Sequence, residues 1–116
     1  GGEWISSIDL ENHIAAMGEV AMAAVVAVSH PRWDERPVAI VVLPPDAGPG
    51  AAHGLLQKVH AHCSKAFAKF QLPDDVLVWE AIPVTSTGKI DKKVIRQRLQ
   101  DAGYQLPDAS GPSSKL

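Results

Sequence analysis

Two apolar runs of strand length constrain the fold of this chain more than any other feature of its sequence. Residues 20–28 are nearly all small and apolar, mostly valine and alanine, and residues 37–43 form a second run rich in valine and isoleucine. Short apolar runs bounded by turn residues are typical of buried strands. The polar residues 32–36 connect the two runs, so we expect the two strands to form an antiparallel pair.

The hydrophobic period changes over residues 53–70. Apolar side chains now recur at intervals of three and four residues, at Leu55, Leu56, Val59, Cys63, Ala66, Phe67 and Phe70. This spacing predicts an amphipathic helix. Pro73 ends the helix, and residues 76–79 then form a third short strand.

Helix-capping signals predict a helix before the first strand. It begins at a short polar residue within 6–9, runs to about Met17 and stops at Gly18. Glu11 falls in its first turn, where the helix dipole favours a carboxylate.

A further helix, residues 92–101, is predicted near the end of the chain. Asp91 is a good N-cap, and Ile90 and Ile95 occupy the positions of a hydrophobic staple. Gly103 ends this helix.

The order of elements predicts an α+β domain. A glycine loop with a short strand opens the chain, and a helix, two strands, a helix, a strand and a helix follow. Strands that return as hairpins give a small, mostly antiparallel three-stranded sheet with helices packed on one side. We expect this domain to span residues 1–103, and residues 104–116, rich in Pro, Ser and Gly, to form a flexible tail.

Composition excludes several classes of function. The net charge of −2 disfavours a nucleic-acid binder. No apolar run reaches the roughly 18 residues of a membrane span, and the single cysteine, Cys63, fits a reducing compartment. We therefore expect an intracellular, cytoplasmic protein. The final residues 114–116, Ser-Lys-Leu, are a peroxisomal address at a true C-terminus, with a chance match as the alternative.

A metal site is not predicted. His60, His62 and Cys63 lie close together in the sequence, but positions two apart on a helix point to different sides. Cys63 belongs to the apolar face and is expected in the core.

The stretch with most chemical interest is residues 83–90, PVTSTGKI. Small hydroxyl residues lead to Gly88 and then Lys89, which predicts an exposed, mobile loop with a free ammonium group. A phosphate-binding loop of the Walker type requires glycine where Pro83 stands and Ser or Thr where Ile90 stands, so that motif is absent. Two interpretations remain: a solvated surface lysine, or a cation brought to a phosphate and a carboxylate held by another domain.

The first residues offer a second candidate. Gly1 and Gly2 lie close to Trp4, and an aromatic ring beside bare backbone suits the wall of a narrow channel. A simple flexible end is the alternative. The chain begins without a start methionine, from which we expect a domain of a longer protein.

Three stretches together resemble one enzyme superfamily. Residues 1–11, GGEWISSIDLE, resemble the glycine-rich hinge-loop motif that opens the C-terminal domain of adenylate-forming enzymes, and residues 83–90 resemble their C-terminal lysine motif. Residues 25–43 are similar to the same region of medium- and long-chain fatty-acyl-CoA ligases. The resemblance covers residues 1 to about 100, in order and at the family's spacing.

The resemblance implies a two-step reaction that uses ATP and coenzyme A. Lys89 would assist formation of the acyl adenylate, on ATP and Mg held by a large N-terminal domain of the same protein, with a fatty acid as the other substrate. The domain would then rotate and present its other face, where Gly1, Gly2 and Trp4 line the pantetheine channel.

The remaining cofactor contacts implied by the resemblance are Gly88, Lys69 and Phe70. Relatives place basic residues near the proline that follows Phe70, where they meet the coenzyme A nucleotide. Here Asp74 and Asp75 follow Pro73, which leaves Lys65 and Lys69, before the proline, as substitutes. The isolated domain is expected to be inactive. A free-standing, non-catalytic small-ligand or protein-binding module of similar fold is the alternative.

Overall fold

The computed structural model describes residues 7–30, 34–48 and 50–106. The predictions for Gly1, Gly2, Trp4, the first short strand and residues 107–116 lie outside them. The elements, in order, are α1 (Ser7–Ala15), β1 (Met22–His30), β2 (Asp34–Val42), α2 (Leu55–Cys63), the 3-10 helix η2 (Lys69–Gln71), β3 (Asp75–Val78) and α3 (Lys92–Asp101).

The three strands form one sheet in the order β1-β2-β3. β1 and β2 are antiparallel, with Met22 opposite Val42, so the predicted pair is confirmed. β3 joins β2 in parallel, from Asp75 opposite Val38. The chain leaves the end of β2, passes through α2 and returns before β3 starts, which is the crossover that a parallel pair requires. The α+β fold is thus confirmed, with a mixed sheet.

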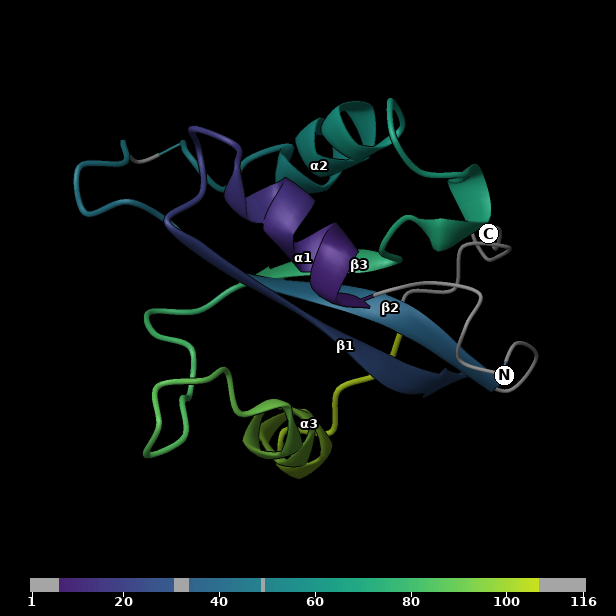
Figure 1. The fold of residues 1–116 in the computed structure, drawn as a ribbon, viewed down its shortest axis with the longest axis vertical. Helices are drawn as coiled ribbons and strands as arrows, with labels where there is room; N and C mark the ends of the chain where they lie inside the picture. The colour runs from purple at the N-terminus through teal and green to yellow at the C-terminus, as the bar shows by residue number, and fades with distance from the viewer. Residues whose placement is uncertain (1–6, 31–33, 49, 107–116) are drawn as a thin grey trace.

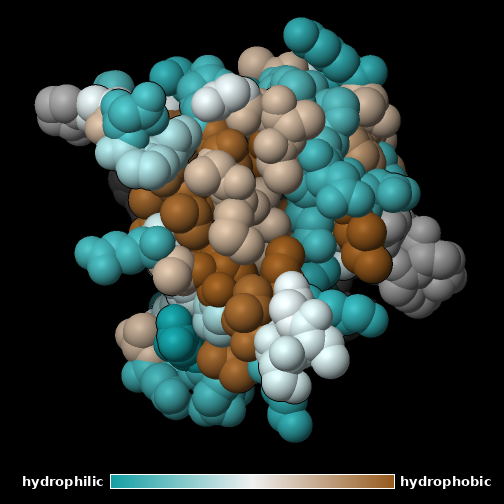
Figure 2. Space-filling model, turned by 60° about the vertical axis from the view of Figure 1, so that its left-hand side comes forward, coloured by the Kyte–Doolittle hydropathy of each residue, from teal (hydrophilic) through white to brown (hydrophobic). Residues whose placement is uncertain are grey.

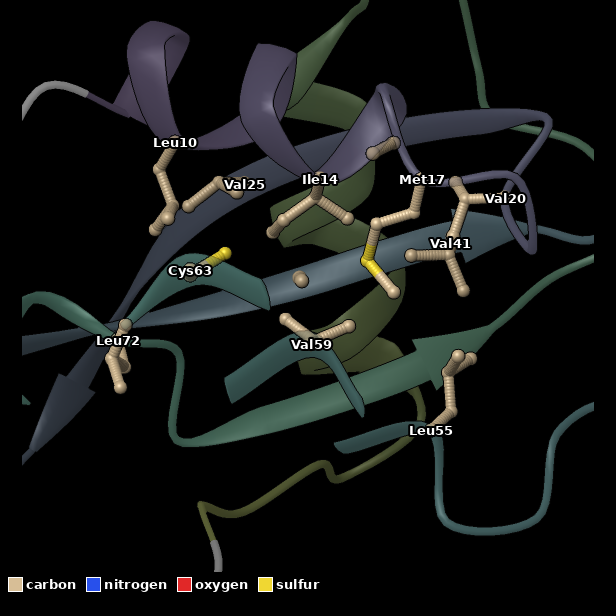
Figure 3. Packing of buried hydrophobic residues seen from close by; sticks show 12 residues of the cluster. Leu10, Ile14, Met17, Val20, Val25, Val41, Leu55, Val59, Cys63 and Leu72 are labelled. Atoms are coloured by element: carbon tan, nitrogen blue, oxygen red, sulfur yellow. The ribbon is translucent and has the colours of Figure 1, made fainter. Parts of the chain in front are cut away.

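Helices cover both faces of the sheet (Figure 1). α1 and α2 lie on one face and α3 on the other. Along β1, Ala23 and Val25 pack into the cluster under α1 and α2, shown in Figure 3, whereas Ala24 and Val26 pack into the cluster under α3. The expectation of helices on one side was therefore wrong. Strands covered on both faces have continuous apolar runs in place of alternation, and that is the pattern of β1 and β2.

Helix α2 is shorter than predicted. It ends at Cys63, after which the backbone N–H groups of Ala66 and Phe67 both donate to the Cys63 carbonyl. Phe67 still packs against the first cluster, but Phe70 lies beyond, in η2, with 57% of its surface exposed. The prediction of a helix to residue 70 was wrong because the chain must turn back there to reach the start of β3.

Helix α3 has the predicted bounds and ends. The Asp91 carboxylate accepts a hydrogen bond from the backbone N–H of Val94 at 3.3 Å, and Ile90 packs with Ile95 in the second cluster. At the other end Gly103 has φ +70°, and the backbone N–H of the next residue donates to Leu99. This is a Schellman cap, which requires a left-handed residue.

Candidate functional site

The lysine loop, residues 83–90, is a small hairpin. Val84 and Ile90 form a β-bridge, the Thr85 N–H donates to the Lys89 carbonyl at 2.7 Å, and the Gly88 N–H donates to the Thr85 carbonyl at 2.9 Å. Gly88 has φ +86°, a conformation that side chains other than glycine rarely adopt. Lys89 is exposed, as predicted. The mobility of the loop stays a prediction, and these hydrogen bonds oppose it.

The hydroxyl groups of this loop hold its shape. Thr85 Oγ1 lies 2.9 Å from Thr87 Oγ1 and accepts a hydrogen bond from the backbone N–H of Lys89 at 3.2 Å. Among the described residues, none makes a hydrogen bond or ion pair with the Lys89 ammonium group. The loop thus fixes the backbone of Lys89 and leaves its charge available to an external anion.

The loop is joined firmly to α3 and, through it, to α1. The Asp91 N–H donates to the Pro83 carbonyl at 2.9 Å. One residue on, the Lys92 ammonium lies 3.1 Å from Glu11 Oε1 and 3.1 Å from Ser7 Oγ. The start of α3 is therefore held to α1, although the two helices cover opposite faces.

Glu11 also bonds to one backbone N–H group at the free edge of the sheet. Its side chain is nearly buried, and Oε1 accepts a hydrogen bond from the backbone N–H of Val25 at 2.9 Å. Val25 lies in β1, which is an edge strand. The predicted role beside the helix dipole did not identify these partners, because both are distant in the sequence.

The second group of predicted contacts lies far from the first. Lys69 and Phe70 are both exposed in η2, which precedes β3, whereas Gly88 and Lys89 lie in the loop that follows it. Figure 1 shows these segments at opposite ends of the molecule. The predicted contacts therefore form two groups, each made of neighbours in the sequence. The structure places these two groups apart.

Sequence reasoning missed Arg36, which organises the segment around η2. Its guanidinium donates to the carbonyls of Phe70 and Leu72 and to the carboxylate of Asp74. In the sequence Arg36 is visible only as an arginine near the start of an apolar strand. Its hydrogen-bond partners lie 34 to 38 residues away, so no local pattern predicts them.

The fold gives structural partners to His13, His60, His62 and Cys63. His60 Nε2 lies 2.6 Å from the Pro73 carbonyl, and the His13 and His62 rings stack at 4.3 Å. Cys63 is fully buried, as predicted, and burial raises the pKa of its thiol to about 11. Within the described ranges, no group of three His, Cys, Asp or Glu side chains is placed to hold a metal ion.

In the part of the chain that the structure describes, no helix combines the length and apolar character of a membrane span.

Comparison with known proteins gives one consistent family. Residues 9–89 match the family model described as the AMP-binding enzyme C-terminal domain. The chain is 45% identical over 102 residues to a long-chain-fatty-acid–CoA ligase of Thermus thermophilus and 36% identical over 101 residues to a medium-chain-fatty-acid–CoA ligase of Ectopseudomonas oleovorans. Each match covers 87% of this chain and 18% of the relative.

Solved structures agree with the sequence matches. The fold resembles part of the fatty acyl CoA synthetase of Mycobacterium tuberculosis with a TM-score of 0.70 and 28% identity, over 84% of this chain and 18% of that one. The chain thus spans about a fifth of the length of these relatives.

Proposed function

Because this chain belongs to the family of AMP-binding enzyme C-terminal domains, we propose that it acts as the C-terminal domain of an AMP-forming fatty-acid–CoA ligase. In such a reaction a carboxylate oxygen attacks the α-phosphorus of ATP and releases pyrophosphate, leaving an acyl adenylate. The thiol of coenzyme A then attacks the acyl carbon and releases AMP. We assign residues 1–103 to this domain and residues 104–116 to a tail, whose first part is not free: Tyr104 and Leu106 pack against the second cluster.

Lys89 is the proposed catalytic residue of the first step. The observation that carries this assignment is an exposed lysine without a partner among the described residues, on a loop whose backbone is held by hydrogen bonds. Its ammonium group would lie between the substrate carboxylate and the phosphate oxygens of ATP, with Gly88 beside it. One well-placed donor of this kind contributes about 3–4 kcal/mol, or roughly 10²–10³ in rate.

The partner of this face would be a large adenylate-binding domain of the same protein, which holds ATP and Mg. Apolar side chains are exposed at one end of the sheet, at Met22 and Val78, and in the loop itself, at Val84. Met22 and Val78 pair with neighbouring residues of β2, and Figure 2 shows an apolar band across this side of the molecule. Exposed apolar surface of this kind is typical of a docking face.

The opposite end of the domain would serve the second step. Lys69 and Phe70 would contact the nucleotide of coenzyme A, and Gly1, Gly2 and Trp4 would line the channel of its pantetheine arm. Since the lysine loop and η2 lie at opposite ends of the molecule in Figure 1, we propose that a single orientation does not present both to the same site. The proposal therefore includes a rotation of the domain between the two steps.

Lys89→Ala in the full-length ligase tests the proposal. We expect acyl-adenylate formation to fall by about a hundredfold or more, and thioester formation from supplied acyl adenylate to survive, because one donor is lost from the first step alone. Lys93→Ala, an exposed lysine on α3, is the matched control and should change neither step. Unchanged adenylation in Lys89→Ala, or ligase turnover by the purified 116-residue chain, would contradict the proposal.

A further inference from the structure

We infer that Arg36 is a positioning residue for coenzyme A: it holds residues 69–74 in the shape that presents Lys69 and Phe70 to the nucleotide. This inference rests on the proposed function, since it concerns the second step of the same reaction. Arg36 would act through the segment that it holds, without touching coenzyme A itself.

One guanidinium group contacts three positions of this segment. Nη1 of Arg36 donates to the Phe70 carbonyl at 2.7 Å and Nη2 to the Leu72 carbonyl at 3.1 Å. Nε and Nη2 also donate to the Asp74 carboxylate, at 3.1 and 2.8 Å. A planar fork with five N–H donors can reach these acceptors together, whereas the single ammonium group of lysine cannot.

Other contacts hold mainly the end of the segment next to β3: Leu72 and Pro73 are buried, His60 Nε2 lies 2.6 Å from the Pro73 carbonyl, and the Asp74 N–H donates to the Pro37 carbonyl at 2.9 Å. η2 contains only three residues, and the backbone hydrogen bonds of the segment with β2 start at Asp74, four residues after Phe70. Phe70 is 57% exposed, so packing does not fix its ring. The backbone carbonyl of that same residue is the closest acceptor of Arg36. The placement of the exposed ring therefore depends on the backbone, and at Phe70 the long-range contact that holds the backbone carbonyl is the one with Arg36.

Arg36 also changes the charge that a phosphate ligand meets. Asp74 forms an ion pair with Arg36 at 2.8 Å, and both side chains are largely buried. The neighbouring Asp75 carboxylate accepts hydrogen bonds from the Tyr104 hydroxyl at 2.7 Å and from the Val76 N–H at 2.9 Å. The two acidic residues after Pro73 are thus engaged within the domain. Their charges oppose the phosphates less than the sequence suggests, and Lys69 remains exposed beside them.

The test compares Arg36→Met and Arg36→Lys in the full-length ligase, with separate assays of adenylation and of thioester formation. In both variants we expect the KM for coenzyme A to rise about tenfold or more, and adenylation to stay within about twofold, because the segment serves only the second step. Arg36→Lys should not restore the KM for coenzyme A, since an ammonium group lacks the planar, forked set of donors of a guanidinium group. With pantetheine, which has no nucleotide, the KM should change by less than about twofold. Arg96→Met, an exposed arginine on α3, is the matched control.

Three results would overturn the inference. They are an unchanged KM for coenzyme A in Arg36→Met, an equal loss with pantetheine, and an equal loss in both half-reactions. An equal loss in both half-reactions would mark Arg36 as a general folding contact. In that case Arg36→Met should also lower the midpoint of thermal unfolding, and so should Asp74→Asn, which removes the negative charge but keeps an oxygen acceptor. Failure of the proposed function has a different signature, unchanged adenylation in Lys89→Ala, so the two are distinguishable.

Discussion

Glu11 shows how a single residue can have a role that its place in the sequence does not reveal. Its first-turn position favours the helix dipole, but the structure gives its carboxylate two specific partners, the Val25 N–H and the Lys92 ammonium group. A nearly buried carboxylate is stable only when it is hydrogen-bonded and paired. Glu11 therefore connects α1, the edge of the sheet and α3.

Cys63 provides a test at the scale of one residue. It is the single cysteine of the chain and is fully buried in the cluster of Figure 3. Burial raises its pKa from 9.0 to about 11, so the folded state favours the protonated thiol. At neutral pH we expect the native chain to react with a thiol reagent roughly a hundredfold or more slowly than the urea-unfolded chain.

The same thiol makes stability depend on pH. Because the folded pKa is raised, the stabilisation is complete below pH 9 and is lost as the pH rises towards 11. Burial and the hydrogen bond to Asp75 also raise the pKa of Tyr104, which adds to the loss at high pH. Urea unfolding from pH 8 to 11 should therefore show a shallower decline in Cys63→Ala. Equal slopes in the two proteins would contradict this prediction.

At the scale of elements, the start of α3 is held from two sides. Its cap, Asp91, is local, whereas the ion pair of Lys92 with Glu11 reaches around the edge of β1. We expect Lys92→Met to lower the free energy of unfolding by about 1 kcal/mol, because it leaves a nearly buried carboxylate without its ion-pair partner while Lys92 itself is partly exposed. Urea unfolding at neutral pH measures this change.

Lys93→Met is the matched control, because Lys93 is the next residue of α3 and is exposed. It should stay within about 0.5 kcal/mol of the unmodified chain. Glu11→Gln combined with Lys92→Met should lose less than the sum of the two single changes, since both remove one interaction. An additive result would show that the ion pair does not stabilise the domain.

At the scale of the whole molecule, one sheet joins two apolar clusters. Ile14 of α1 lies in the first and Ile95 of α3 in the second, and both are fully buried. Each of Ile14→Ala and Ile95→Ala should cost about 2–5 kcal/mol, because each leaves a cavity in a packed core. Both should retain one unfolding transition, with the same midpoint by circular dichroism and by tryptophan fluorescence, since the clusters share β1 and β2.

Exposed residues on the same two helices serve as controls. Ile8 of α1 is 61% exposed and Val94 of α3 is 36% exposed, so their alanine variants should lose no more than about 0.5 kcal/mol. A separate, earlier transition in Ile95→Ala would show that α3 unfolds by itself and that the domain is not one cooperative unit.

The sequence by itself determined the elements whose signals are local. The apolar runs predicted β1 and β2 and their antiparallel pairing, and the cap and staple residues predicted the bounds of α3. The motif around Lys89 and the order of the motifs pointed to the family that residues 9–89 match. These signals are readable because each depends on neighbouring residues, through backbone propensity, capping and side-chain period.

Only the tertiary structure decided how the elements combine. The parallel placement of β3, the helices on both faces and the end of α2 at Cys63 depend on where the chain returns in space. The partners of two key side chains are also distant in the sequence: Arg36 reaches residues 34 to 38 positions away, and Lys92 donates to Ser7 across 85 positions. Periodicity and capping act over about one turn of chain, so contacts at such separations become defined only when the two clusters pack against the sheet.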